Sequence, residues 1–180
     1  MLLGIDLGGT KIEGIVLKSK ENPKEIIRHR INTEEEKGYS QVINNIKSLV
    51  NHIENKINYK FKRLGIGTPG TIDPETRLLK NSNSQCLNGM PIQKDLAKVL
   101  DKIILIQNDA NCFALAETLL GSVKDQYPDA KNVFGIIIGT GVGGGVIIDG
   151  KTVYGSQGIG GEWGHTIVTD DGDECYCGKK

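Results

Sequence analysis

The residues best suited to bind a ligand lie in two glycine-rich segments of the chain. The first segment, residues 4–11, reads GIDLGGTK, and the second, residues 135–145, reads GIIIGTGVGGG. Each lies between apolar runs of strand character, which predicts a hairpin with glycine at its turn. Glycines let a backbone approach a phosphate closely, and free N–H groups and threonine hydroxyls can donate hydrogen bonds to it. Two such hairpins can hold a polyphosphate from opposite sides, which indicates an enzyme that uses a nucleotide.

Neither segment matches the commoner phosphate-binding loops. The first lacks the G-x-x-x-x-G-K-[ST] order of a P-loop, and the second contains G-x-G-x-x-G only from Gly139 to Gly144. A dinucleotide fingerprint requires a helix directly after its glycines, whereas residues 146–150 read VIIDG and predict a strand that enters a turn. Either segment alone could be an ordinary tight hairpin. Two copies, one with Asp6 ahead of its glycines and one with Thr140 between them, favour a phosphate site.

Composition narrows the class of protein. The chain has 180 residues, of which 38% are hydrophobic and 24% charged, and its formal net charge is zero. These values are typical of a soluble globular chain and give no support for nucleic-acid or membrane binding. Asp6 interrupts the apolar N-terminus, so we expect neither a signal peptide nor a membrane span. The cysteines are therefore expected to be reduced thiols in the cytoplasm: Cys86, Cys112, Cys175 and Cys177.

Strands and helices alternate along the chain, which predicts an α/β fold. Outside the two hairpins, the expected strands are 25–31, 63–67, 103–106 and 163–168, and the expected helices are 39–57, 91–100 and 110–120. The clearest is the helix over 39–57, because its apolar residues recur at helical spacing. A polar, turn-rich loop is expected over 71–90. The proline-containing stretch 124–131 predicts a boundary between a first domain, 1–123, and a second, 124–180.

Asp109 is the candidate catalytic base. It stands where a predicted buried strand ends and a predicted helix begins, so its carboxylate could project into a cleft. Aspartate is also a common helix N-cap, and the spacing alone leaves both interpretations open.

Taken together, the motifs resemble the ROK family of bacterial sugar kinases and sugar-responsive repressors. The motifs that carry the resemblance are DLGGTK at 6–11, GTPG at 67–70, NDAN at 108–111, GTGVGGG at 139–145, GEWGH at 161–165 and CYCGK at 175–179. The resemblance covers essentially the whole chain and implies the actin-like ATPase (ribonuclease H-like) fold, with a complete N-terminal lobe and the start of a second lobe. The residues over 80–91 look most like the fructokinase (manno-fructokinase) branch, although N-acetylglucosamine kinases share most of the same scaffold.

The resemblance implies phosphoryl transfer from ATP to a hexose. Fructose, giving fructose 6-phosphate, is the expected acceptor, and N-acetylglucosamine, glucose or mannose is the alternative. Asp109 matches the catalytic base of the family, and Asp6 matches the carboxylate that faces Mg²⁺ and the phosphates. The residues implied in ATP and phosphate binding are Asp6, Gly8, Gly9, Thr10, Lys11, Gly139, Thr140, Gly141, Gly143 and Gly144.

Sugar recognition requires groups that pair with several hydroxyls at once. The residues implied for this by the resemblance are Gly70, Asn83, Asn108, Asp109, Glu162 and His165. On the residues alone, Asn83 could equally cap its own turn, and Glu162 could be a surface carboxylate.

A zinc site is also implied. His165, Cys175 and Cys177 match three ligands of the structural Zn²⁺ site of the family. A C-x-C pair with one distant histidine is only suggestive by itself, and two incidental thiols with a buried histidine are the alternative. Relatives carry a further cysteine beyond the CYCGK segment, so we expect the site in this chain to be incomplete and its zinc to be held less rigidly.

The resemblance also predicts the partners of the protein, which are ATP, a small-molecule sugar and a second copy of the chain in a homodimer. Relatives continue well beyond Lys180, so we expect the chain to be the N-terminal part of a kinase and to be a poor kinase by itself. Two other functions are considered. The first is a ROK repressor, whose DNA-binding segment would precede the kinase-like part, and we expect no room for it because the first motif begins at Leu2. The second is an inactive fragment that acts only by association with another subunit.

Overall fold

The structure is a computed structural model that describes residues 1–139 and 141–174. It divides into two compact units, Met1–Asp109 (unit 1) and Ala110–Lys180 (unit 2). The sequence places the boundary later, after residue 123. The division lies earlier because the helix that begins at Asp109 packs against the strands of unit 2, as described below.

Unit 1 is built on a five-stranded sheet with the order β3-β2-β1-β4-β7. Its strands are β1 (Leu2–Leu7), β2 (Lys11–Leu17), β3 (Glu25–Asn32), β4 (Arg63–Thr68) and β7 (Ile103–Asn108). The first three strands are antiparallel, and β1, β4 and β7 run parallel to one another. The carboxyl ends of these three neighbouring strands therefore meet at one edge of the sheet.

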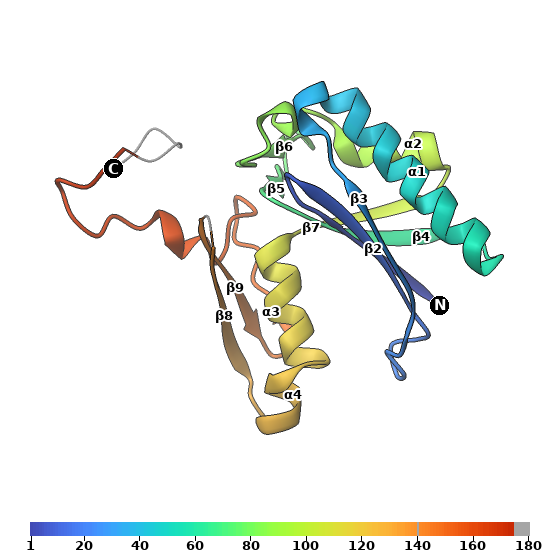
Figure 1. The fold of residues 1–180 in the computed structure, drawn as a ribbon. Coiled ribbons are helices and arrows are strands. Elements are labelled where there is room, and N and C mark those ends of the chain that lie inside the picture. The colour runs from blue at the N-terminus through green and yellow to red at the C-terminus, as the bar shows by residue number, and fades with distance from the viewer. Residues whose placement is uncertain (140, 175–180) are drawn as a thin grey trace. The chain divides into compact units, whose positions relative to one another are not determined.

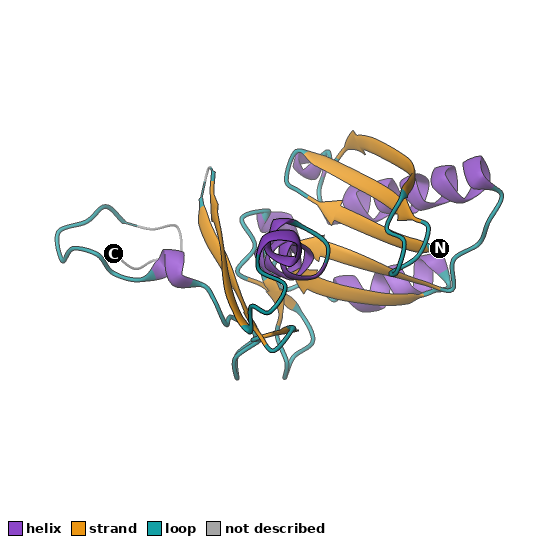
Figure 2. Ribbon diagram, turned by 90° about the horizontal axis from the view of Figure 1, so that it is seen from below, coloured by secondary structure: helices purple, strands orange, loops and turns teal. Residues whose placement is uncertain are grey.

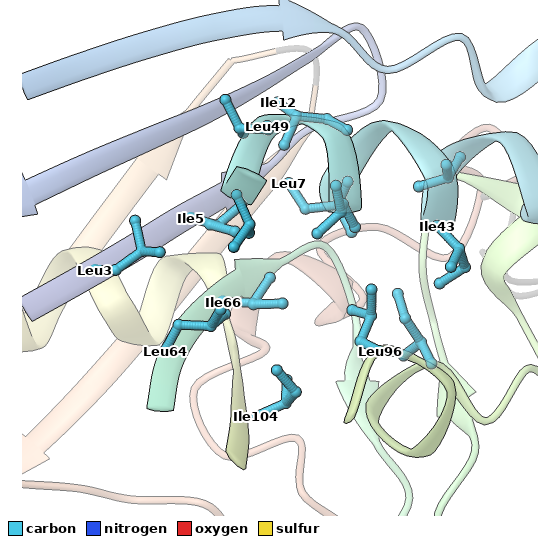
Figure 3. Close-up of a cluster of buried hydrophobic side chains, with 14 of the residues drawn as sticks. Leu3, Ile5, Leu7, Ile12, Ile43, Leu49, Leu64, Ile66, Leu96 and Ile104 are labelled. Atoms are coloured by element: carbon cyan, nitrogen blue, oxygen red, sulfur yellow. The ribbon is translucent and has the colours of Figure 1, made fainter. Parts of the chain in front are cut away.

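Two helices, α1 (Tyr39–Ile57) and α2 (Ile92–Leu100), lie against the same face of this sheet (Figures 1 and 2). Strand alternation explains which residues they cover, because Leu3, Ile5 and Leu7 of β1 are buried while Leu2 and Asp6 are exposed. Figure 3 shows the resulting core of aliphatic side chains from the strands and both helices. These elements confirm the strands and helices that the sequence predicts over this region.

Close packing of α1 on the sheet depends on Gly14 of β2. A Cβ at Gly14 would lie 2.4 Å from Cδ1 of Ile53 on α1, so a larger residue would push the helix away from the strand. The helix ends at Asn58, whose φ of 51° is left-handed and common at helix C-termini.

A buried carboxylate ties α1 to the start of the parallel strands. Glu54 is 2% exposed and accepts hydrogen bonds from the ammonium groups of Lys60 and Lys102 at 2.9 Å and from the N–H of Phe61 at 2.8 Å. Burial alone would raise the pKa of Glu54, but the hydrogen bonds from Lys102, Phe61 and Lys60 outweigh it and lower that pKa. The carboxylate is therefore charged and paired at neutral pH.

We expect Glu54→Gln to lower the free energy of unfolding by about 3 kcal/mol, because it leaves the buried ammonium of Lys102 without its counter-charge. Folding lowers the pKa of Glu54, so its stabilisation is present above the unfolded-state pKa of about 4.3 and is lost as the pH falls through the lower folded-state value. Urea unfolding at several pH values measures both effects. The exposed Glu36→Gln serves as control, and equal stability of the two variants at pH 7 would contradict this role of Glu54.

The loop predicted over 71–90 contains more structure than the sequence suggested. A small antiparallel hairpin, β5 (Thr71–Ile72) and β6 (Leu79–Lys80), is followed by a short 3-10 helix, Gln85–Leu87. Asp73 organises the hairpin, since Oδ1 accepts from the N–H groups of Glu75 and Thr76 and Oδ2 accepts from the ammonium of Lys80 at 2.7 Å.

Unit 2 contains a three-stranded antiparallel sheet with the order β10-β9-β8. Its elements are α3 (Asp109–Leu119), α4 (Ser122–Gln126), β8 (Asn132–Ile138), β9 (Val142–Ile148), β10 (Lys151–Thr152) and a 3-10 helix, Trp163–His165. Small residues let α3 lie close to the sheet, because a Cβ at Gly135 or Gly145 would come within 3 Å of Ala114 or Ala110. Figure 1 shows α3 along β8 and β9.

The strand predicted over 163–168 is wrong. Residues 163–165 form a 3-10 helix, and no strand follows in the described residues up to 174. The reason is that the indole of Trp163 folds back onto β9, where its N–H donates to the carbonyl of Gly143, instead of extending into a new strand. No helix in the described residues is long and apolar enough to cross a membrane.

Candidate functional site

The turn between β1 and β2 is the first of the two predicted phosphate sites. The N–H of Gly8 donates to the carbonyl of Lys11 at 3.0 Å and closes the turn. Thr33, which is buried directly after β3, supports the turn with two hydrogen bonds. Its hydroxyl donates to the carbonyl of Gly8 at 2.6 Å, and its N–H donates to the carbonyl of Thr10. The ammonium of Lys11 donates to the side chain of Asn32. The turn is thus fixed by two neighbouring strands.

Gly9 brings this turn close to two polar side chains. A Cβ at Gly9 would lie 3.3 Å from Oγ of Ser84 and 3.4 Å from Oε2 of Glu35. That Oε2 atom is buried and accepts no hydrogen bond from the described part of the chain. A buried acceptor without a donor is costly, so Glu35 offers the edge of the turn a free acceptor for a hydroxyl or N–H.

Two carboxylates, Asp6 and Asp109, meet at the carboxyl edge of the unit 1 sheet. Asp6 pairs in register with Gly67 of β4, and Asp109 directly follows β7 on the other side of β4. Burial raises the pKa of Asp6, the charges of Asp109 and Glu13 raise it further, and Arg30 opposes them. Asp6 is exposed to solvent over part of its surface. Even so, desolvation of its carboxylate by the surrounding protein is the largest cause of its raised pKa. Two carboxylates that repel each other are suited to binding a divalent cation between them. Such a pair also favours acceptance of a proton by one of its members.

Gly70 and Asn108, both predicted to bind sugar, are in direct contact. Asn108 is 6% exposed at the end of β7, and its Nδ2 donates to the carbonyl of Gly70 at 3.1 Å. Gly70 has a φ of 78°, and a Cβ there would lie 2.3 Å from the carbonyl oxygen of Lys80. Only glycine fits this position, so the turn after β4 is held between β7 and the loop that follows β6.

Asn83, the third predicted sugar ligand of unit 1, is exposed between the buried Ser82 and Ser84. Asn88 fixes this loop, because its Oδ1 accepts from the N–H of Ser82 at 2.9 Å and its Nδ2 donates to the carbonyl of Ser82 at 2.8 Å. Since Ser84 approaches Gly9 and the backbone of Ser82 approaches Gly70, the structure brings the unit 1 candidates together at one edge.

The second predicted phosphate site is the β8–β9 hairpin of unit 2. The N–H of Gly139 donates to the carbonyl of Gly141 at 2.9 Å, and a Cβ at either glycine would meet open space. These two glycines therefore have open space beside them. Thr140, which stands between these glycines and is also predicted to contact phosphate, lies outside the described residues.

Gly143 and Gly144, further along β9, contact the segment that carries Glu162 and His165. The indole N–H of Trp163 donates to the carbonyl of Gly143 at 3.1 Å, and a Cβ at Gly144 would lie 2.5 Å from the indole ring. The phosphate contacts expected of these two glycines stay a prediction. What the structure adds is that Trp163, which lies between Glu162 and His165 in the sequence, packs on this hairpin.

The zinc site also stays a prediction. Cys175 and Cys177 lie outside the described residues, so their position relative to His165 is not described. Within residues 1–139 and 141–174, no group of three His, Cys, Asp or Glu side chains is arranged to hold a metal ion.

The residues that support the site were missed by sequence reasoning. They are Thr33, Glu35, Asn88 and Trp163. Thr33 and Trp163 act through contacts with residues at least 20 positions away, which no local pattern reveals. The one available signal was that Trp163, the single tryptophan of the chain, stands directly beside Glu162.

Comparison with known proteins agrees with this geometry. The ROK family profile matches residues 2–180. The N-acetyl-D-glucosamine kinase of Aliivibrio salmonicida is 37% identical over 190 residues, covering 100% of the chain and 60% of that protein. The glucokinase of Thermotoga maritima is 33% identical over 181 residues, covering 99% of the chain and 54% of that protein. The chain thus spans little more than half the length of these relatives.

Two solved structures also resemble the chain. The ROK hexokinase of Thermus thermophilus has a TM-score of 0.80 at 29% identity, over 99% of the chain and 56% of that protein. A ROK family glucokinase from Streptomyces griseus, in complex with glucose and AMPPNP, has a TM-score of 0.82 at 26% identity, over 99% of the chain and 54% of that protein. These likenesses confirm the expected α/β fold of the actin-like ATPase type.

The curated relatives bear on the branch of the family. Those described above are named N-acetyl-D-glucosamine kinase and glucokinase, so they give no support to the fructokinase branch and favour the alternative acceptors. The motifs, the fold and the match over residues 2–180 agree on the wider assignment, and the chain belongs to the ROK family.

Proposed function

We propose that the protein is an ATP-dependent sugar kinase whose preferred acceptor is N-acetylglucosamine. The observation that carries the proposal is the carboxylate pair Asp6 and Asp109 at the carboxyl edge of the parallel strands, beside the β1–β2 turn. Relatives named N-acetyl-D-glucosamine kinase support the choice of sugar, and the AMPPNP complex of the Streptomyces griseus glucokinase supports the choice of nucleotide.

Asp109 acts as the general base in this proposal. It accepts the proton of a sugar hydroxyl while the hydroxyl oxygen forms its bond to the γ-phosphorus and the bond from that phosphorus to the bridging oxygen breaks. The products are a sugar phosphate and ADP. When bound, Mg²⁺ and ATP supply charge neutralisation and the phosphoryl group. The β1–β2 turn and the tip of the β8–β9 hairpin donate N–H groups to the phosphates.

Asp6 is the residue proposed to hold Mg²⁺. Mg²⁺ takes one or two carboxylates together with phosphate oxygens and water, and a carboxylate whose pKa is raised by a neighbouring negative charge gains from a cation beside it. Asp6 therefore fits the ion.

The sugar hydroxyls are proposed to be bound by residues of both units. These are Gly70, Asn83 and Asn108 of unit 1 and Glu162 and His165 of unit 2. Asn108 is held by its hydrogen bond to the carbonyl of Gly70, and the loop that carries Asn83 is held at the neighbouring Ser82 by Asn88. This arrangement fixes the backbone of these residues before the sugar arrives. Two further predictions belong to the proposal. Zn²⁺ is bound by His165, Cys175 and Cys177, which elemental analysis checks, and the protein is a homodimer, which light scattering checks.

The test is ADP release by the full-length protein with ATP and Mg²⁺, measured across N-acetylglucosamine, glucose, mannose and fructose. We expect the highest kcat/KM with N-acetylglucosamine. Preference for fructose would return the protein to the fructokinase branch. Sugar binding without turnover would instead favour a sugar-responsive regulator or a non-catalytic association partner.

A further inference from the structure

Asn83, the exposed residue of unit 1 proposed to bind sugar, lies between two peptide groups that the surrounding loop holds in place. On one side, the carbonyl of Ser82 accepts hydrogen bonds from Nδ2 of Asn88 at 2.8 Å and from Nε2 of Gln85 at 3.3 Å. On the other side, the N–H of Ser84 donates to Oγ of Ser82 at 3.1 Å. Because peptide groups are planar, the two planes that flank a residue determine its φ and ψ. These bonds therefore determine the direction in which the Asn83 side chain leaves the backbone.

Asn88 pairs with both backbone groups of Ser82. Its Nδ2 donates to the carbonyl of Ser82, and its Oδ1 accepts from the N–H of the same residue at 2.9 Å. One amide side chain thus bonds Ser82 as a neighbouring strand would. An asparagine amide is suited to this because it carries a donor and an acceptor side by side. Aspartate has the same shape, but its carboxylate has no donor for the carbonyl of Ser82.

The backbone that carries Asn88 is attached to the core of unit 1. Leu87, which precedes Asn88, is 1% exposed and belongs to the hydrophobic core. After Asn88, the N–H of Gly89 donates to the carbonyl of Leu79 at 2.8 Å, and the side chain of Leu79 belongs to the same core. Asn88 therefore connects the loop over residues 82–84 to the packed interior of the unit.

The same loop borders two other parts of the candidate site. A Cβ at Gly70 would lie 2.8 Å from the backbone nitrogen of Ser82, and one at Gly9 would lie 3.3 Å from Oγ of Ser84. Ser82 and Ser84 are buried, whereas Asn83 between them is exposed. A displacement of this loop therefore moves Asn83 relative to the turn after β4 and to the β1–β2 turn.

We propose that Asn88 is a positioning residue for the acceptor sugar, because it holds Asn83 in the orientation that bonds a sugar hydroxyl. This inference rests on the proposed kinase function and on the role of Asn83 in it. Asn88 acts through Asn83 and does not itself contact the sugar. The contact that it orients binds the ground state and the transition state alike, so its loss raises the KM for the sugar and leaves kcat and the KM for ATP unchanged.

The first measurement is the steady-state kinetics of Asn88→Asp in the full-length protein, with the hexose that the wild type phosphorylates best. The substitution places a carboxylate oxygen against the carbonyl of Ser82 in place of a donor. We expect the KM for the sugar to rise at least about tenfold, because a misplacement of about 1 Å can cost about 10²-fold, while kcat and the KM for ATP keep their wild-type values. Asn51→Asp makes the same chemical change at an exposed residue of α1, and this matched control should leave all three unchanged.

The second measurement is a double-mutant cycle that tests whether Asn88 acts through Asn83. Asn83→Ala is expected to raise the dissociation constant of the sugar, measured by calorimetry, and Asn88→Asp is expected to add little further loss in that background. Gln85→Ala removes the longer of the two bonds to the carbonyl of Ser82 at an exposed residue, and should raise the KM for the sugar by a smaller factor. It keeps the inference testable if Asn88→Asp does not fold.

Two kinds of failure are distinguishable. A wild-type protein that neither binds nor phosphorylates any hexose would overturn the proposed function, and this inference with it. An active wild type beside folded Asn88→Asp or Gln85→Ala variants of unchanged KM would overturn the role of Asn88 alone. Equal losses of sugar affinity on Asn88→Asp with and without Asn83→Ala, or wild-type affinity in Asn83→Ala itself, would also overturn that role and leave the kinase function intact.

Discussion

Replacement of Asp109 by asparagine is expected to lower kcat for sugar phosphorylation about 10²- to 10⁴-fold, because an amide cannot accept the proton of the sugar hydroxyl. The substitution is chosen because Asp109 begins α3, and asparagine caps a helix as well as aspartate does. The variant therefore removes the base while it preserves the helix. Steady-state kinetics with N-acetylglucosamine, together with the melting temperature, separate the two roles.

The control for this prediction is Asp109→Ala, which removes the base together with every polar group of the side chain at the start of α3. We expect it to lower kcat as much as Asp109→Asn and, in addition, to lower the melting temperature. If Asp109→Asn kept near-normal turnover, Asp109 would be a helix cap only, which is the alternative that the sequence left open.

The second large effect is expected at Asp6. Asp6→Asn should raise the Mg²⁺ concentration required for half-maximal activity by at least about tenfold, because an amide oxygen carries no net charge for the cation. The same substitution should leave the protein without ligands as stable as the wild type or more stable at pH 7.

The reason for the gain in stability is electrostatic. Burial, Asp109 and Glu13 raise the pKa of Asp6, so folding disfavours its charged form. This cost is absent below the unfolded-state pKa of about 3.9, where both states are protonated, and it is fully present above the higher folded-state pKa. Melting temperatures of wild type and Asp6→Asn should therefore converge at acidic pH. A variant that is less stable than the wild type at pH 7 would contradict this account of Asp6.

Local sequence was sufficient for the elements that carry the site in unit 1. Alternating burial in β1 and the helical spacing of apolar residues in α1 are local patterns, and both elements appear where the sequence predicts them. The end of the strand before Asp109 could also be predicted from the sequence, because a short apolar run stops there at polar residues.

The parts that sequence reasoning missed depend on contacts between distant residues. The support of the β1–β2 turn by Thr33 joins residues 25 positions apart. The strand expected at Trp163 failed because a β-like composition says nothing of whether an indole will fold back onto a glycine surface. The division between the units at Asp109 follows from small residues on α3 that face glycines of β8 and β9, a match visible only when both are placed.

The comparisons favour other acceptors than the fructose that the motifs suggested, and the reason is related. The side chains of Asn83, Asn108 and Glu162 are suited to hydrogen bonds with hydroxyl groups that hexoses have in common. These motifs therefore indicate a hexose but do not indicate which hexose. Discrimination depends on the space around the substituents of the ring, which the motifs do not encode.

The measurement that tests the central claim most directly is a ³¹P NMR spectrum of the full-length protein with ATP, Mg²⁺ and N-acetylglucosamine, recorded beside Asp109→Asn. The account predicts a sugar phosphomonoester signal that grows in step with ADP in the wild type and is nearly absent in the variant. ADP without a sugar phosphate, or a sugar phosphate formed equally well by Asp109→Asn, would contradict it.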